Sequence, residues 1–249
     1  MVSTALQGVY TSLRLYHGAD APKAAMDALY RKFIKPGDLV FDVGAHAGDR
    51  ISSFRRLGAR VIAMEPQPLM FRALRLIHGH DDSVVLLQKA ASNSGGQLTL
   101  RINSNNPTVS TASSEFVANA SGKEGWQGQN WDGAMAVECT TLDHLISTYG
   151  LPSFIKIDVE GFEHAVLEGL STPIPALSFE LTTIARDVAV ECLAQLSKIG
   201  TYGFDFAHGE SQVLKFGRWV NELEMAHFIR DLPHAANSGD IYAIRLDAD

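Results

Sequence analysis

Apolar residues along the first part of the chain alternate between short continuous runs and a helical repeat. Apolar runs bounded by turn residues indicate buried strands, and apolar positions three and four apart indicate helices. Strands are therefore predicted at 39–44, 60–66 and 83–92, and helices at 23–33, 49–58 and 69–79. Because strands and helices alternate through short links, the pattern predicts a parallel sheet covered by helices on both faces.

The predicted helix at 69–79 has several apolar positions, and their spacing decides which of its faces meets the sheet. A helix that covers a sheet turns one apolar stripe inward and leaves its polar residues in water. We expect four side chains to form this stripe: Leu69, Ala73, Leu76 and Ile77.

The pattern becomes polar in the middle of the chain, where residues 103–134 lie between predicted strands at 97–102 and 135–140. This segment is rich in Asn, Ser and Gly and contains Trp126 and Trp131. It fits either a partly disordered surface loop or a substrate cover, because long loops in compact domains are often functional. In the same way, the two tryptophans fit either contacts to a sugar or anchors of the loop.

The last part of the chain returns to alternating strands and helices. Strands are predicted at 154–161, 176–182, 202–209 and 240–247, and helices at 140–150, 161–170 and 187–200. Thr141 is a plausible N-cap, since its hydroxyl can accept a hydrogen bond from a backbone amide of the first turn. No internal repeat or interdomain linker is evident, so we expect one domain over 1–249, with a helical extension at 1–37.

Composition excludes several classes of function. The chain of 249 residues is 46% hydrophobic, and its formal net charge of −7 argues against a nucleic-acid binder that neutralises phosphates. No apolar run is long enough to cross a bilayer, and the N-terminus lacks the features of a signal peptide, so we expect a cytoplasmic protein. Cys139 and Cys192 have no metal-like spacing and are expected to be buried, reduced thiols.

Candidate chemistry begins at FDVGAHAGD (41–49), directly after the first predicted strand. Glycines in a strand-to-helix turn let ligand atoms approach the backbone, and its free amides favour negative charge. The spacing fits neither the G-x-G-x-x-G dinucleotide fingerprint nor a Walker A loop. Asp42, Gly44 and Gly48 instead resemble the D-x-G-x-G-x-G turn of S-adenosylmethionine (AdoMet)-dependent methyltransferases, with His46 at the middle glycine.

The ends of the next two strands suggest a nucleoside site. Glu65, followed by Pro66, ends the second strand, where an acid can accept hydrogen bonds from both ribose hydroxyls. Dinucleotide enzymes also use an acid here, so Glu65 indicates a nucleoside rather than methyl transfer in particular. Ala90 and Ala91 leave room for a flat adenine ring, although small residues also suit the close packing of a strand end.

AdoMet has no phosphate, so a different part of it must meet the glycine turn. Its methionine carboxylate could lie at the turn's backbone amides, and Asp42 could face its ammonium group, directly or through water. The turn residues expected to contact the cofactor are Gly44, Ala45, His46 and Gly48.

With FDVGAHAGD, MEPQP, TTLDHL, FIKIDVEGFEHAVLEGL and FEL in this order, the chain resembles the FkbM family of AdoMet-dependent methyltransferases over roughly 38–182. The resemblance implies an α/β, Rossmann-like class I methyltransferase fold with a seven-stranded, mostly parallel sheet whose last strand is antiparallel. It implies O-methylation of a hydroxyl on a sugar, polyketide or similar small metabolite. It carries AdoMet-binding roles to Asp42, Gly44, Glu65 and Asp158, while His46 replaces the family's usual Asn.

Several acids lie at or just past predicted strand ends, where ligands bind in open parallel sheets. Asp158 is our first choice for the acceptor side, as a base or as a group that orients the hydroxyl, with Glu160 and Glu180 next. His164 and His208 are weaker candidates, because a lone histidine is more often structural. The three acids could hold a divalent cation through hard oxygen ligands, but paired acids are also common without metal, and we do not favour a metal.

Two other classes of function remain open at this stage. One is a nicotinamide-dependent oxidoreductase, against which the missing third glycine argues. The other is a non-catalytic AdoMet-binding module that kept the fold, against which the retained acids argue mildly. The predicted partner is a small-molecule or glycan acceptor, which the sequence does not identify.

Overall fold

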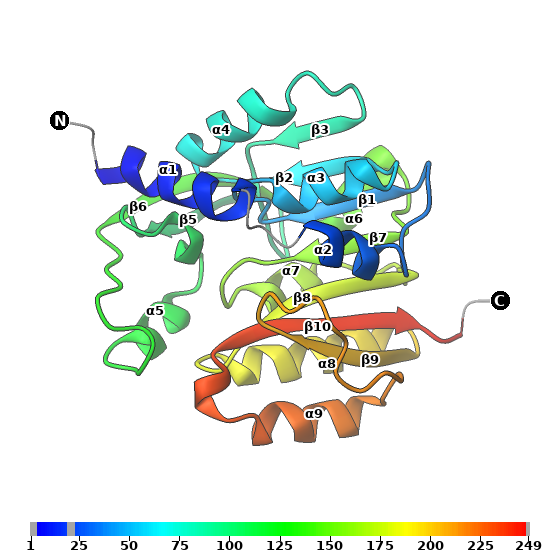
Figure 1. The fold of residues 1–249 in the computed structure, drawn as a ribbon. Helices are drawn as coiled ribbons and strands as arrows, with labels where there is room; N and C mark the ends of the chain where they lie inside the picture. Colours follow the sequence, from blue (N-terminus) through cyan, green and yellow to red (C-terminus); the bar gives the residue numbers. More distant parts are fainter. Residues whose placement is uncertain (1–3, 19–22, 248–249) are drawn as a thin grey trace.

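The computed structural model describes residues 4–18 and 23–247, and its centre is a seven-stranded sheet (Figure 1). The strands lie in the order β3-β2-β1-β7-β8-β10-β9, and β10 runs antiparallel to both of its neighbours. Their bounds are β1 (Leu39–Val43), β2 (Arg60–Met64), β3 (Val84–Leu87), β7 (Phe154–Ile157), β8 (Ala176–Thr182), β9 (Tyr202–His208) and β10 (Ser238–Arg245). The predicted mostly parallel sheet with an antiparallel last strand is therefore confirmed.

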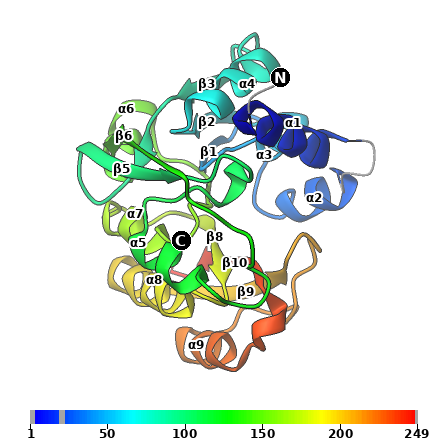
Figure 2. The same ribbon diagram turned by 90° about the vertical axis from the view of Figure 1, so that its left-hand side faces the viewer.

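Helices cover both faces of this sheet, and each face has its own core (Figure 2). On one face α6 (Leu142–Tyr149), α7 (Glu163–Glu168), α8 (Arg186–Ile199) and α9 (Glu222–Asp231) enclose one hydrophobic cluster. On the other face α2 (Lys23–Tyr30), α3 (Asp49–Arg56) and α4 (Pro68–His78) enclose a second cluster. The Thr141 hydroxyl accepts the His144 amide at the start of α6, which confirms the predicted cap. Both cysteines are buried free thiols, as predicted.

The predicted strand at 83–92 is wrong in its second half. β3 ends at Leu87, and Ala90–Ala91 form β4 of a separate three-stranded sheet. In that sheet β4 and β5 (Gly96–Ile102) pair with opposite edges of β6 (Gly133–Thr140). The chain bends between β3 and β4. The hydrophobic pattern does not predict this bend, because both segments are apolar. The strands predicted at 97–102 and 135–140 are confirmed.

The predicted inward face of α4 is also wrong in part. Leu76 is 81% exposed and Ile77 is exposed as well, whereas Met70 and Leu74 are buried. Two overlapping sets of positions in this helix fit a helical repeat, and the packing selects between them. Met70 packs against α1 (Thr4–His17), and Leu74 packs against α3. Contact with α1 therefore decides which side of α4 is buried. The prediction considered only the contact of this helix with the sheet.

Residues 103–134 form a packed segment rather than a disordered loop. They contain the 3-10 helix η1 (Pro107–Val109) and α5 (Ser114–Ala120). Trp126 lies edge-on against Phe116 at 5.1 Å between ring centroids, and the Trp131 Nε1 donates to the Val109 carbonyl at 2.8 Å. This cluster packs on Ile184 just before α8. Both tryptophans therefore act as anchors of the segment.

The N-terminal helices bracket the glycine turn from outside the sheet. Helix α1 lies against α4 and η1, and α2 lies against α3 (Figure 1). Of the predicted helical extension at 1–37, residues 1–3 and 19–22 lie outside the described part of the chain. Among the described residues, no helix combines the length and the apolar character needed to span a membrane.

Candidate functional site

A cavity opens at the carboxyl ends of β1, β2 and β7, where an open parallel sheet is expected to bind ligands. It brings together most of the residues that the sequence singled out: Asp42, Gly44, Ala45, His46, Glu65, Pro66, Ala90, Ala91, Asp158 and Glu160. Gly48 and Glu180 are not among the lining residues. The segment 103–134 also contributes to the wall through Thr108, Ser110 and Ala112.

Gly44 allows the turn after β1 to press against the end of β7. Its φ is +85°, and a Cβ built on it would lie 1.8 Å from the backbone oxygen of Asp158. The Asp158 amide in turn donates to the Val43 carbonyl at 2.9 Å. Only glycine fits such a close backbone approach in a left-handed conformation. This contact brings Asp42 and Asp158 to the same end of the cavity.

The backbone amides of the turn already have acceptors within the protein. The amides with such acceptors are those of Gly44, Ala45, His46 and Gly48. The first two donate to the Met64 carbonyl at 3.0 and 2.8 Å, and the third donates to Glu65 Oε2 at 2.9 Å. For these four amides the expectation that they bind a ligand carboxylate is therefore not supported, because they bond to the end of β2, to Glu65 just after it, or within the turn itself.

Gly48 serves the packing of helices rather than the cavity wall. Its φ is +82°, and a Cβ there would lie 2.6 Å from Leu74 and 2.9 Å from His78 on α4. The His78 ring bonds to the Gly48 carbonyl at 3.0 Å through Nε2, and the His17 ring bonds to the Ala47 carbonyl at 2.7 Å. These contacts fix the start of α3 between α1 and α4.

Glu65 is buried, with 3% of its surface exposed, and it holds two loops together. In addition to the His46 amide, it accepts the Gln67 amide through Oε1 at 2.7 Å. Burial raises the pKa of Glu65 to about 7, although these hydrogen bonds oppose the shift. Each carboxylate oxygen can accept a second hydrogen bond, so the group can still receive a ligand diol.

Asp42 is 1% exposed, and its Oδ2 has no hydrogen-bond donor among the described residues. Burial raises the pKa of Asp42 to about 7, and the charge of Asp49 adds to the shift. A buried oxygen without a donor is costly, and ligand donors at such a position relieve that cost. The side chain therefore fits a cationic amine in the cavity.

Asp158 has a buried partner that the sequence reasoning missed. The Lys156 Nζ lies 3.0 Å from Asp158 Oδ2 and 2.9 Å from Asp240 Oδ1 on β10. Burial alone would raise the pKa of Asp158, but the charge and hydrogen bond of Lys156 bring it below its ordinary value. Asp158 is therefore ionised at neutral pH. The alternation of β7 places Lys156 two residues before Asp158, and this spacing was the signal available in the sequence.

Asp158, Glu160 and Glu180 form one group, with ligand oxygens that all lie within 4.8 Å of one another. The pKa values of Glu160 and Glu180 are raised well above the ordinary range, first by burial and then by the neighbouring acids. The group thus combines one carboxylate whose pKa is lowered with two whose pKa values are raised. Its oxygens could also bind a hard divalent cation.

The segment 103–134 fixes the backbone beside this group. The Thr111 hydroxyl donates to the Glu160 carbonyl at 2.7 Å, and Glu160 has a φ of +56°. On the other side of the loop, Glu163 accepts the amides of Val159 and Gly161. These bonds hold the carboxylate of Glu160 in the cavity wall.

The histidines occupy different positions. His164 pairs with Glu191 of α8 at 3.5 Å, and His208 bonds to the Ala236 carbonyl, so neither lines the cavity. His46 does line it, edge-on to the ring of Tyr16 at 5.4 Å between centroids. Burial lowers the pKa of His46 to about 4, so its ring is neutral at physiological pH.

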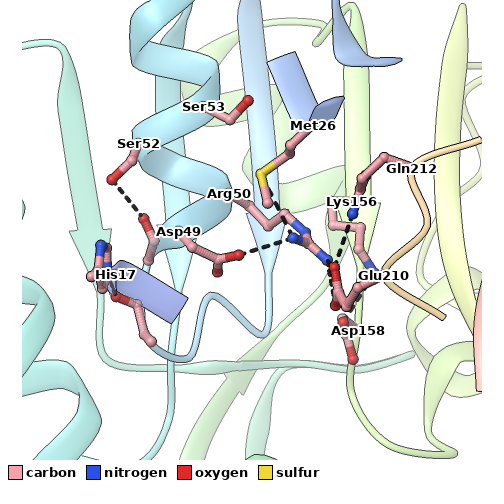
Figure 3. A network of polar contacts seen from close by, with 12 residues as sticks. His17, Met26, Asp49, Arg50, Ser52, Ser53, Lys156, Asp158, Glu210 and Gln212 are labelled. Carbon is pink, nitrogen blue, oxygen red and sulfur yellow. Dashed lines mark hydrogen bonds and ion pairs between the residues drawn. The ribbon is translucent and has the colours of Figure 1, made fainter. Parts of the chain in front are cut away.

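An ion pair at the cavity wall joins parts of the chain that are distant in sequence (Figure 3). Arg50 of α3 binds Glu210, which follows β9, and both residues line the cavity. The sequence reasoning did not identify this pair.

Comparisons with known proteins agree with this geometry. The family described as methyltransferase FkbM domain matches residues 42–224. The hexuronic acid methyltransferase AglP of Haloferax volcanii is 27% identical over 156 residues, which are 61% of this chain and only 57% of AglP. The crystal structure of a TehB-like SAM-dependent methyltransferase from Corynebacterium glutamicum superposes with a TM-score of 0.50 at 10% identity. That superposition covers 98% of this chain and 100% of the other, and it shows a shared fold.

Proposed function

The chain belongs to the FkbM methyltransferase family, and we propose that it transfers the methyl group of AdoMet to a hydroxyl oxygen of a sugar or related small metabolite. The observation that carries this proposal is the buried Asp42 oxygen without a donor, in a cavity that also holds Glu65. Asp42 suits the ammonium group in the methionine part of AdoMet, and Glu65 suits the ribose diol in its nucleoside part. Because the curated relative is matched over little more than half of its length, its substrate supports the acceptor class only by analogy.

The cofactor would extend along the carboxyl ends of three strands. Asp42 and the ionised Asp158 would face its ammonium group, and Glu65 would accept the two ribose hydroxyls. Ala90 and Ala91 would leave space for the adenine ring at the far end of the cavity. Gly44, Ala45, His46 and Pro66 would contact it through packing.

When bound, the sulfonium supplies an already activated methyl group, so the protein must mainly align the acceptor and remove one proton. AdoMet would supply the methyl carbon, with its sulfur keeping the electron pair as the leaving group, and the residues of the cavity would hold the acceptor oxygen in line with that carbon. The hydroxyl proton would pass to a carboxylate of the chain. Alignment can contribute roughly 7–11 kcal/mol, and a general base about 10²–10⁴-fold in rate.

Within this proposal Asp158 and Glu160 have different roles toward the acceptor. Lys156 keeps Asp158 ionised and a weak base, which suits a group that orients the hydroxyl and faces cations. Glu160 lines the cavity with a raised pKa, and cationic groups bound nearby would lower that pKa towards the working range of a base. Glu180 has a carboxylate oxygen within 4.8 Å of this group but does not line the cavity. A divalent cation at these acids is not needed for these roles.

The segment 103–134 is proposed to cover the acceptor. It supplies one wall of the cavity through Thr108 and Ser110, whose hydroxyls suit a polar acceptor. Its attachment through Thr111 to the Glu160 loop would link acceptor contacts to the position of the base. The tryptophans anchor this wall from behind and do not contact the cavity.

Calorimetric titration with S-adenosylhomocysteine tests the cofactor assignment. We expect saturable binding, followed by methyl transfer from AdoMet to one of a panel of hexuronic acids, neutral sugars and polyketide alcohols, detected by mass spectrometry. A folded protein that bound NADH instead would support an oxidoreductase. Binding of AdoMet without consumption by any acceptor in the panel would support a non-catalytic module.

A further inference from the structure

Arg50 is a buried cation on the wall of the proposed cofactor cavity, with 8% of its surface exposed (Figure 3). Its Nη1 donates to Asp49 Oδ2 at 2.9 Å and approaches the Met26 sulfur at 3.6 Å. Its Nη2 donates to both carboxylate oxygens of Glu210, at 2.9 and 2.8 Å. The Nη1 nitrogen is thus held by residues of α2 and α3, and the Nη2 nitrogen binds the carboxylate of Glu210.

The carboxylate partner comes from the surface. The side chain of Glu210 is 54% exposed, in the turn after β9, and it also accepts the Gln212 side-chain amide at 2.9 Å. About half of the Glu210 side chain is exposed, so its carboxylate can return to water when another carboxylate takes its place on Arg50. Arg50 itself stays fixed by its contacts with Asp49 and Met26.

The methionine end of AdoMet carries a carboxylate that needs a partner. Four of the turn amides, those of Gly44, Ala45, His46 and Gly48, are bonded within the protein. The other lysines and arginines on the described cavity wall are Lys156, which is shared between two acids, and Lys89, which pairs with Glu138 at the nucleoside end. Arg50 is the cation at the opposite end, and its charge acts on both Asp42 and Asp158.

This arrangement matches an α-amino acid. Its ammonium and carboxylate are attached to the same carbon, so a receptor for both needs acids and a cation side by side. Asp42 and Asp158 supply the acids, and Arg50 supplies the cation. A guanidinium is well suited to a carboxylate because it donates several hydrogen bonds in a plane.

We propose that Arg50 binds the α-carboxylate of AdoMet, and that Glu210 occupies the same guanidinium nitrogen until the cofactor displaces it. The inference rests on the proposed function, because it names the receptor for one end of the same ligand. Glu210 is then an internal competitor that lowers the affinity for ligands with an amino-acid tail. Nucleosides without that tail do not compete with it.

Two ligands that differ only at this end test the proposal. S-adenosylhomocysteine has the amino-acid carboxylate, and 5′-methylthioadenosine has the same nucleoside thioether without it. Calorimetry would compare both ligands on the wild type, Arg50→Gln and Glu210→Gln. Arg55→Gln is the matched control, since Arg55 lies on the same helix and pairs with Asp81 away from the cavity.

We expect Arg50→Gln to weaken S-adenosylhomocysteine about 10–100-fold and to leave 5′-methylthioadenosine unchanged within about twofold. Glu210→Gln should strengthen S-adenosylhomocysteine severalfold without affecting the shorter ligand. Because Glu210 is exposed, this variant tests the proposal even if Arg50→Gln folds poorly. Arg55→Gln should bind both ligands like the wild type.

Equal losses for both ligands in Arg50→Gln would overturn the proposal, because Arg50 would then act only by supporting the fold. Weaker S-adenosylhomocysteine binding in Glu210→Gln would overturn the displacement, because Glu210 would then contact the ligand itself. If the wild type bound neither ligand, the proposed function would fail as well, and that result differs from the other two.

Discussion

Replacing Gly44 by alanine should separate the glycine turn from the end of β7. A Cβ at Gly44 would lie 1.8 Å from the Asp158 oxygen, whereas Cβ atoms practically never come within 3.0 Å of another heavy atom. The difference is about 1.2 Å, and it must be absorbed by two backbone segments rather than by a flexible side chain. Overpacking of this kind costs about 1–3 kcal/mol, in addition to about 1–2 kcal/mol for a left-handed alanine.

Gly37 offers a matched control for the conformational part of this cost. Its φ is +89°, close to that of Gly44, and apart from its chain neighbours no described residue has a heavy atom within 4 Å of a Cβ built there. Gly37→Ala should therefore lose only about 1–2 kcal/mol of unfolding free energy. The difference between the two variants isolates the contact with Asp158.

Urea unfolding followed by circular dichroism, together with calorimetric titration of S-adenosylhomocysteine, measures both consequences. Gly44→Ala should be less stable than Gly37→Ala by about 1–3 kcal/mol, and its affinity for the ligand should fall at least about tenfold. Gly37→Ala should keep the wild-type affinity. Equal stabilities and equal affinities in the two variants would refute the close approach as the reason for a glycine at this position.

The remaining predictions concern the carboxylates of the cavity. In Glu65→Gln, an amide group would face a backbone donor, so unfolding free energy should fall by about 1–3 kcal/mol in urea titrations, and ligand affinity should fall with it. Hydrogen-bond donors of the ligand need Glu65 and Asp42 in their ionised forms, and the pKa values of both groups in the free protein are about 7. The association constant of S-adenosylhomocysteine, measured by calorimetry, should therefore rise at least about tenfold from pH 6 to pH 8. An association constant that fell as the pH rose would contradict this prediction. Lys156→Met leaves the buried Asp240 and the partly exposed Asp158 without their shared cation and should cost about 3–5 kcal/mol in chemical denaturation. Glu160→Gln should lower kcat about 10²–10⁴-fold in a methyl-transfer assay while S-adenosylhomocysteine still binds, and an unchanged kcat would exclude it as the base.

The central sheet was predictable because its order follows from local patterns. Short apolar runs, glycine turns and helical repeats determine the alternation of β and α elements, and general rules of connection then arrange them. Leu76 and Ile77 were misplaced because the apolar spacing of α4 fits two faces, and only contact with α1 selects one. The bend before Ala90 was missed because it depends on pairing with β6, nearly fifty residues later in the chain.

The cavity was predictable where its residues belong to strand ends. Asp42, Glu65 and Asp158 stand at the carboxyl ends of parallel strands, and such ends meet at one edge. Arg50 was not predictable as a ligand, because its partner Glu210 is 160 positions away and no local pattern connects them. The occupied amides of Gly44, Ala45 and His46 were missed for a similar reason, since their acceptors belong to Met64 at the end of β2 and to Glu65 just after it.

Tyr16 of α1 forms part of the cavity wall, yet the family match begins only at residue 42. A chimera that joined residues 42–249 to the leading segment of another member would carry the acids proposed to be catalytic and exchange this ring for a foreign one. The proposed chemistry and this part of the cavity wall therefore belong to separate stretches of the chain. Ligand preference in such grafts should follow the donor of the leading segment, with the reaction itself preserved.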